Sequence, residues 1–221
     1  MTEAEWRTCG SRVHMRRMIV GRWPDLFRRW IFFNLACLRR VEDLLGEPRC
    51  RALMDLLESS SASANCQRLL SHHTECEDVR DTIRELMARL DDPFRLARVA
   101  ACHGLLAAGD CTLATSEMVA VAVGRQAGNP RDERRAHCGL LRDIFGNPFR
   151  PVAFDPAWGT DTAVSLARLM YDLRDFGAMP ILADALQDAG CEDEQILVHC
   201  RDANQVHVRG CWVVDLVLGK E

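Results

Sequence analysis

The sequence contains almost no lysine, a single tyrosine and no apolar run long enough to cross a membrane. Lys220 is the only lysine beside 27 arginines, and the arginines are spread along the chain among acidic residues. We therefore expect no nucleic-acid partner, because such interfaces need clustered basic residues next to exposed aromatic rings. The longest apolar runs, Trp30–Leu38 and Met118–Val123, fall far short of the roughly 20 residues that span a bilayer. We expect no membrane association either.

Catalytic and nucleotide-binding motifs are also missing, since the chain has no P-loop, GxGxxG, GxSxG or HExxH sequence. It has no Asn-Gly or Asp-Gly hairpin signal and no sustained alternation of polar and apolar residues, so strand signals are almost absent. The valine-rich segment 211–218 would also suit a strand, but a helix is favoured there because its neighbours are helical. The 11 cysteines include no CxxC pair, and the polar start MTEAEW does not read as a signal peptide. These features predict reduced thiols and a cytoplasmic location.

Helix signals recur along the whole chain. A capping box of Thr2 and Glu5 predicts a short helix at the start. Apolar residues at helical spacing, bounded by proline or capping residues and by glycine, predict the others. These helices are expected over residues 24–46, 48–57, 75–90, 93–109, 115–123, 130–145, 161–173, 180–190, 192–200 and 211–218. The predicted fold class is all-α, an irregular helical bundle.

A proline-rich segment divides this pattern. Pro148, Pro151 and Pro156 exclude a regular helix over nine residues. Because the segment is also apolar, we expect an extended strap, residues 149–158, that lies over the core. The strap leads into a C-terminal helical module, 140–221, which follows a variable N-terminal helical region, 1–139; one continuous domain is the alternative. The serine-rich run 59–63 is the best candidate for a flexible joint.

Four segments of the C-terminal module carry a resemblance to known proteins. They are LLRDIFGNPFRPVAFDPAW (140–158), MPILADALQDAGC (179–191), HCR (199–201) and HVRGCWVVDLVLGKE (207–221). Together they resemble the C-terminal block of a large paralogous family of uncharacterised planctomycete proteins. The first residues of the chain, MTEAEW, also resemble the usual start of that family. The helix at 182–190 is similar, more faintly, to a repeat-companion domain of the same bacteria. The resemblance implies a cytoplasmic protein with many paralogues, and it transfers no activity.

The C-terminal module also holds the densest group of histidines and cysteines. Its members are Cys191, His199, Cys200, His207 and Cys211. Their nitrogen and sulfur atoms suit zinc in a tetrahedral site. Structural zinc sites usually contain close-spaced ligand pairs, which this chain lacks, so core packing and helix capping are the competing interpretation and no cofactor is expected on balance. A second group, His72, His73 and Cys76, could also bind a metal, and a solvated helix cap is its competing interpretation.

A thiol-based reaction is a further hypothesis for the same residues. Cys211 would attack, His207 or His199 would act as the base, and Asp215 or Asp184 would orient it. A nucleophilic thiol needs partial exposure and a lowered pKa, whereas the apolar run after Cys211 favours burial.

Asp215 is conspicuous because it is the only charged residue of an otherwise apolar segment, 211–218. A buried carboxylate is costly unless it is paired. We expect Arg209 or His207 to be its partner, in a structural polar knot.

The leading functional hypothesis is a non-enzymatic protein-interaction or scaffold module. A groove beside the strap would bind a protein partner, with Phe149, Phe154 and Trp158 as anchors. Packing of these rings into the core is the competing interpretation. The alternative function is a metal-dependent or thiol-based enzyme centred on His199, Cys200, His207 and Cys211. The sequence identifies neither the partner nor the oligomeric state.

Overall fold

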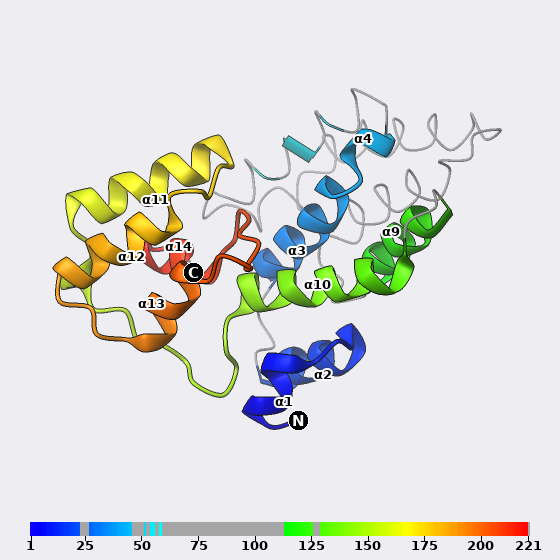
Figure 1. Cartoon of the computed structure of the whole chain (residues 1–221), viewed down its shortest axis with the longest axis horizontal. Helices are drawn as coiled ribbons and strands as arrows, with labels where there is room; N and C mark the ends of the chain where they lie inside the picture. The colour runs from blue at the N-terminus through cyan, green and yellow to red at the C-terminus, as the bar shows by residue number, and fades with distance from the viewer. Residues whose placement is uncertain are drawn as a thin grey trace.

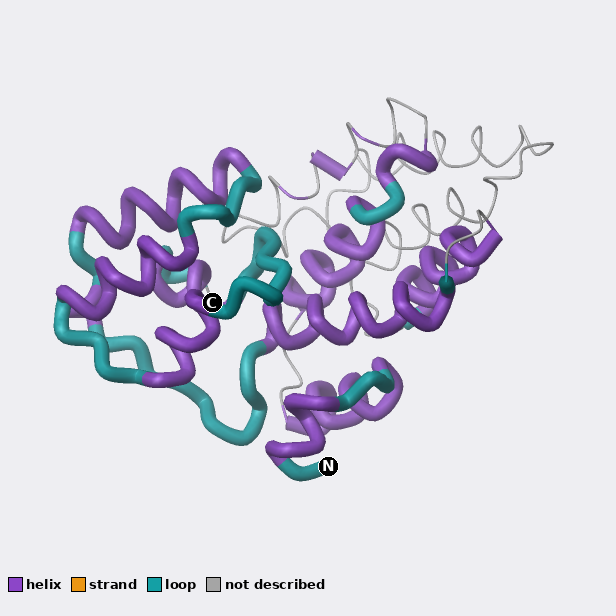
Figure 2. The backbone as a smooth tube through the Cα atoms, in the orientation of Figure 1, coloured by secondary structure: helices purple, strands orange, loops and turns teal. Residues whose placement is uncertain are grey.

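The structure, a computed structural model, describes residues 1–22, 27–45, 51, 54, 55, 58, 113–125 and 129–220. Within these ranges all regular secondary structure is helical and no strand occurs (Figure 2), which confirms the predicted all-α fold. Several predicted features lie outside the described residues: the helices over 75–90 and 93–109, the serine-rich joint at 59–63, and the group His72, His73 and Cys76. None of the described helices is long and apolar enough to cross a membrane.

The central helix of the fold is α3, which is buried along nearly its whole length. The helices of the first part of the chain are α1 (Glu3–Thr8), α2 (Arg12–Arg22), α3 (Phe27–Arg39), α4 (Glu42–Leu45), α9 (Ala114–Arg125) and α10 (Pro130–Phe145). Every residue from Trp30 to Leu38 is buried, and all except Asn34 are apolar, as expected for a helix segment inside the core. It packs against α9 and α10. The helix predicted over 24–46 is broken after Arg39, where the Val41 N–H bonds the Leu38 carbonyl at 3.0 Å.

The sequence did not predict α2. Its buried residues are Arg12, Met15 and Ile19, too few for a clear apolar stripe. It packs against α10, and its Arg12 guanidinium donates hydrogen bonds to Ser116 and Glu117 of α9.

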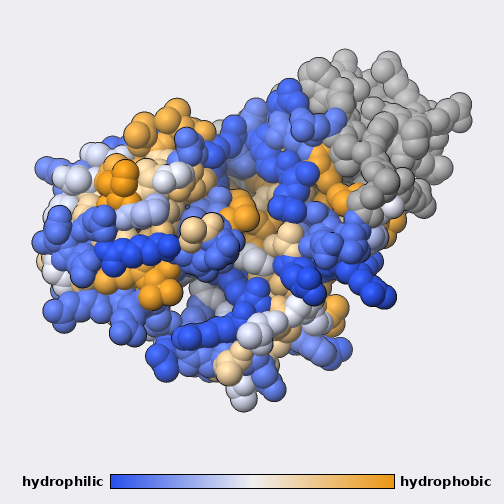
Figure 3. All heavy atoms as spheres, viewed as in Figure 1, coloured by the Kyte–Doolittle hydropathy of each residue, from blue (hydrophilic) through white to orange (hydrophobic). Residues whose placement is uncertain are grey.

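The last part of the chain forms a group of helices around a short buried one. These helices are α11 (Asp161–Leu173), α12 (Met179–Asp188), α13 (Glu194–Arg201) and α14 (Trp212–Val217). Figure 1 shows α11, α12 and α13 grouped around α14, with α10 leading from this group to α3 and α9. Five of the six residues of α14 are buried, so this short helix forms the centre of the group. The face seen in Figure 3 is mainly hydrophilic, with separate hydrophobic patches.

The predicted strap connects α10 to α11 without a regular helix. It contains one turn of 3-10 helix at Pro156–Trp158, begun by Asp155, whose side chain accepts a hydrogen bond from the Ala157 N–H at 2.9 Å. The Phe154 and Trp158 rings meet edge to face, with centroids 5.6 Å apart.

The predicted partner of Asp215 was wrong. Asp215 is 1% exposed, and both of its carboxylate oxygens bind the guanidinium of Arg28 on α3, with Nη2 to Oδ1 at 3.1 Å. Arg209 instead donates to the backbone carbonyls of Tyr171 and Asp172 and lies 3.3 Å from Glu58. Arg209, which is near Asp215 in sequence, thus binds elsewhere, and the tertiary fold brings the distant Arg28 to the carboxylate.

Candidate metal centre

Four side chains from separate elements converge beside α14. They are Asp143 of α10, His199 of α13, His207 of the loop that follows α13, and Cys211 at the N-cap of α14. One potential ligand atom of each lies within 4.8 Å of all the others. Among the described residues, this is the only such group of three or more histidine, cysteine or acidic side chains.

Four of the six distances between these ligand atoms are close to those of a tetrahedral zinc site. Asp143 Oδ1 lies 2.8 Å from His207 Nδ1 and 3.2 Å from His199 Nε2. Cys211 Sγ lies 3.3 Å from His199 Nε2 and 3.8 Å from His207 Nδ1. Zinc bonds of about 2.3 Å to sulfur and about 2.0 Å to nitrogen or oxygen imply edges of roughly 3.5 Å and 3.3 Å in a tetrahedron. These four edges depart from the tetrahedral values by about half an ångström or less. The remaining two, between Asp143 and Cys211 and between His199 and His207, are at most 4.8 Å.

Asp143 is held in place by the buried face of α10. Asn129 caps this helix, Pro130 occupies its first turn, and Gly146 with φ of +68° ends it. The Asp143 side chain is completely buried, and its Oδ2 accepts a hydrogen bond from the Val208 N–H at 2.9 Å. That bond fixes the carboxylate so that Oδ1 faces the two histidines.

The other three side chains depend on how the chain leaves α13 and returns to α14. Asp193 caps α13 through the Gln195 and Ile196 N–H groups, which places His199 in the last turn. The return requires Gly210, where φ is +88° and a Cβ would lie 2.7 Å from the Phe32 Cβ. Only glycine combines this backbone conformation with this close approach to α3, and the next residue is Cys211.

Burial and contacts within the group shift the pKa values of two of its members. Burial alone would raise the pKa of Asp143, yet the contacts with His199 and His207 hold that pKa below its ordinary value. Burial, with a contribution from Asp143, raises the pKa of the Cys211 thiol well above its ordinary value. A metal ion would compensate the buried carboxylate and displace the thiol proton.

The same properties argue against a nucleophilic role for Cys211. A reactive thiol is accessible and has a lowered pKa, whereas Cys211 has no exposed surface and a raised pKa. The two carboxylates expected to orient a base lie elsewhere: Asp215 pairs with Arg28, and Asp184 is exposed beside Arg201.

The structure brings together three of the five predicted metal ligands, His199, His207 and Cys211. Cys191 and Cys200 are buried free thiols outside the group. Cys200 follows His199 directly on a helix, where adjacent side chains point about 100° apart, so only one of the two faces the other ligands.

Sequence reasoning missed Asp143. Its neighbours Leu140, Leu141, Ile144 and Phe145 are apolar and buried. A lone carboxylate on the apolar face of a helix was therefore the available signal, and the same argument had singled out Asp215.

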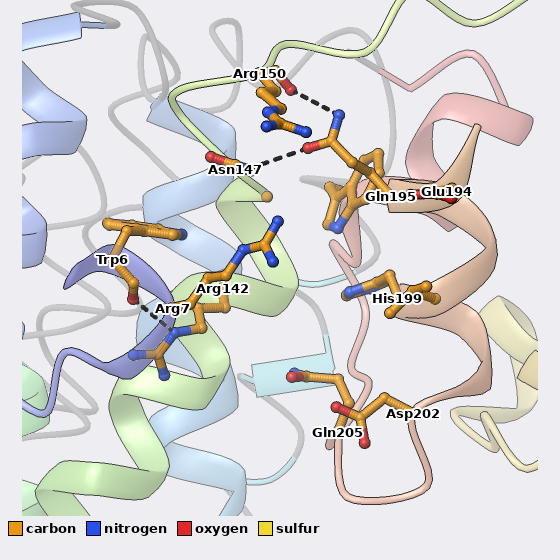
Figure 4. A pocket seen from close by; sticks show the side chains of 13 residues that line it. Trp6, Arg7, Arg142, Asn147, Arg150, Glu194, Gln195, His199, Asp202 and Gln205 are labelled. Carbon is orange, nitrogen blue, oxygen red and sulfur yellow. Dashed lines mark hydrogen bonds between the residues drawn. The ribbon is translucent and has the colours of Figure 1, made fainter. Parts of the chain in front are cut away.

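A cavity of about 410 Å³ adjoins the group. It lies between α1 and α10 on one side and α13 and α14 on the other, and His199 forms part of its wall (Figure 4). Arg142 and Gln205 also line it, as does Trp212, whose ring centroid lies 5.2 Å from that of His199. The cavity therefore reaches the edge of the four-residue group.

The three aromatic residues predicted as partner anchors are not fully exposed. Phe149, Phe154 and Trp158 are each partly buried and pack against the core. An interaction role for them stays a prediction.

Comparison with known proteins does not extend this description of the centre. No family model, curated protein or solved structure matches the chain. The functional argument therefore depends on the geometry of Asp143, His199, His207 and Cys211.

Proposed function

We propose that this protein binds a zinc ion through Asp143, His199, His207 and Cys211, and that the ion stabilises the C-terminal group of helices. The observation that carries the proposal is the convergence of four ligand atoms within 4.8 Å of one another. Two imidazole nitrogens, one thiolate and one carboxylate in a tetrahedral arrangement are a donor set that zinc prefers.

A structural role fits the site better than a catalytic one. Catalytic zinc sites use three protein ligands and keep a position open for water or substrate, whereas structural sites are closed by four. Here four protein side chains are available as ligands, and Asp143 and Cys211 are completely buried. The ion would join α10, α13 and α14.

This role agrees with the non-enzymatic, cytoplasmic scaffold that the sequence predicts. The six described cysteines, Cys9, Cys37, Cys138, Cys191, Cys200 and Cys211, are all free. Free thiols are typical of a reducing compartment, which supports that location. A rigid zinc-stabilised module would present its surface to a protein partner.

Metal content tests the proposal directly. The full chain, purified under reducing conditions without chelator and then equilibrated with zinc and desalted, should retain stoichiometric zinc by elemental mass spectrometry. Cys211→Ser and His207→Ala should each lose it, because each removes one ligand. Cys200→Ser is the matched control, since it changes a buried thiol that lies outside the group.

Two results would contradict the proposal. One is wild-type protein that retains no stoichiometric metal after equilibration. The other is a Cys200→Ser variant that stays folded by circular dichroism and loses zinc as completely as Cys211→Ser does.

A further inference from the structure

The ligand at the edge of the centre is His199, whose side chain is 12% exposed. Asp143 and Cys211 are completely buried and the His207 side chain is 7% exposed. The Nε2 atom of His199 faces inward, toward Asp143 Oδ1 at 3.2 Å and Cys211 Sγ at 3.3 Å. The opposite ring nitrogen, Nδ1, is consequently the one left for contacts outside the centre.

That Nδ1 atom makes no hydrogen bond to any described residue. When Nε2 binds a metal, the remaining ring proton is on Nδ1, which becomes a hydrogen-bond donor. Metal-bound histidines almost always donate this N–H to a carboxylate, a carbonyl or a water. Since His199 forms part of the cavity wall, a molecule in the cavity is in a position to supply the acceptor.

The cavity also contains a cation without an acidic partner. Arg142 is half-buried, and its guanidinium donates hydrogen bonds to the backbone carbonyls of Trp6, at 3.1 Å, and Cys9. No carboxylate of the described chain contacts it. A charge held partly away from water without a counter-ion is costly.

The rest of the lining does not cancel this charge. Arg7 and Arg150 share the single carboxylate of Glu3, at 2.9 Å and 3.0 Å. The acidic residues on the opposite wall, Glu194 and Asp202, are exposed. Water and salt therefore screen those two carboxylates more strongly than they screen Arg142.

We infer that the cavity binds a small carboxylate or phosphate anion, which accepts a hydrogen bond from His199 Nδ1 and is attracted by Arg142. This inference rests on the proposed zinc site, because the metal sets the tautomer of His199. Anion and metal should then strengthen each other's binding by the same factor. An outer acceptor on a metal-bound histidine typically changes metal affinity by about 10-fold to 100-fold, so we expect at least about tenfold tighter metal binding at saturating anion.

Cobalt(II) is a suitable probe, because its visible absorption reports the coordination of the ion. The full chain is loaded with cobalt and titrated with acetate or with inorganic phosphate, and chloride at matched ionic strength serves as the control. A saturable change in the visible bands is expected, together with tighter cobalt binding in competition with a chelator. A response to acetate alone assigns the site to carboxylates, and a response to phosphate alone assigns it to phosphates.

Val198 offers a matched pair of variants for locating the anion. It precedes His199, lines the cavity and is 66% exposed, so a substitution there should leave the fold intact. Val198→Glu should raise the anion concentration needed for half-saturation, and Val198→Lys should lower it.

The outcomes separate the two proposals. Failure to form a cobalt–thiolate spectrum would remove the metal site itself. A normal spectrum that neither acetate nor phosphate alters more than chloride does would overturn the anion site alone. Equal half-saturation in the two Val198 variants, or weaker cobalt binding when anion is added, would also overturn it.

Discussion

Removal of the Asp215 carboxylate should destabilise the protein strongly. Asp215→Ala would leave the Arg28 guanidinium, whose side chain is only 16% exposed, without its carboxylate partner. Removing one member of a buried ion pair costs about 3–5 kcal/mol, mainly because the other charge stays buried. Arg28 would keep its hydrogen bonds to the Tyr171 hydroxyl, at 3.3 Å, and to the Lys220 carbonyl, at 3.1 Å. We therefore expect the lower end of this range, about 3 kcal/mol.

Thermal and urea unfolding, followed by circular dichroism, measure this loss. For a chain of this size each kcal/mol corresponds to about 2–4 °C, so the melting temperature should fall by roughly 6–12 °C. Asp215→Asn keeps the size of the side chain and removes its charge, so it separates lost packing from lost pairing. The double variant Arg28→Met with Asp215→Leu should recover most of the stability, because apolar replacement of both partners is often neutral.

The reasoning would be refuted by an Asp215→Ala variant that melts within about 2 °C of wild type, which corresponds to no more than about 1 kcal/mol. A double variant less stable than Asp215→Ala alone would also contradict it, because the remaining buried charge would then not be the source of the cost.

Three further predictions concern other parts of the fold. Gly190→Ala and Gly210→Ala both place a side chain at a φ near +90°, but only the side chain at position 210 also meets α3. In urea unfolding, Gly190→Ala should lower the free energy of unfolding by about 1–2 kcal/mol, and Gly210→Ala should lower it by about 1–3 kcal/mol more. Equal losses would contradict the close approach of Gly210 to α3. Burial would raise the pKa of Glu133, but contacts with His137 and Arg40 hold that pKa at about 2. The resulting stabilisation of the fold, roughly 3 kcal/mol at most, should be present above about pH 4.5 and be lost as the pH falls toward 2. In acid titrations of stability, Glu133→Gln should lack this pH dependence. Asp143→Asn should melt at the same temperature with and without chelator, whereas wild type supplied with zinc at about 100 times its dissociation constant should lose about 2.7 kcal/mol when the ion is removed.

Local signals predicted the second half of the fold well. The helices expected over 130–145 and 161–173 have the same bounds in α10 and α11, because capping residues, proline and glycine fix helix ends within a few residues. The α2 helix was missed because long-range contacts position it, namely packing against α10 and the hydrogen bonds of Arg12 to α9. Such contacts leave no period in the sequence.

The candidate site shows the same division. His199, His207 and Cys211 lie within one short stretch and could be recognised as a group. Asp143 comes from a helix far earlier in the chain, and only the packing of α10 beside α14 brings it to them. Cys200 is not part of the candidate site because of the direction in which the last turn of α13 faces. The composition of the chain contains no information about that direction.

The contacts of α3 have a consequence for cutting the chain. A fragment that begins at Leu140 would contain the three ligands of the last stretch and also Asp143, so it would keep the whole candidate metal site. It would lack the Phe32 ring that covers Gly210 and the Arg28 guanidinium that pairs with Asp215. The excised piece would thus expose to water the side of α14 that α3 now shields. The stability of the fragment and its tendency to aggregate would then be determined by this newly exposed surface. Binding partners are therefore better sought with the full chain.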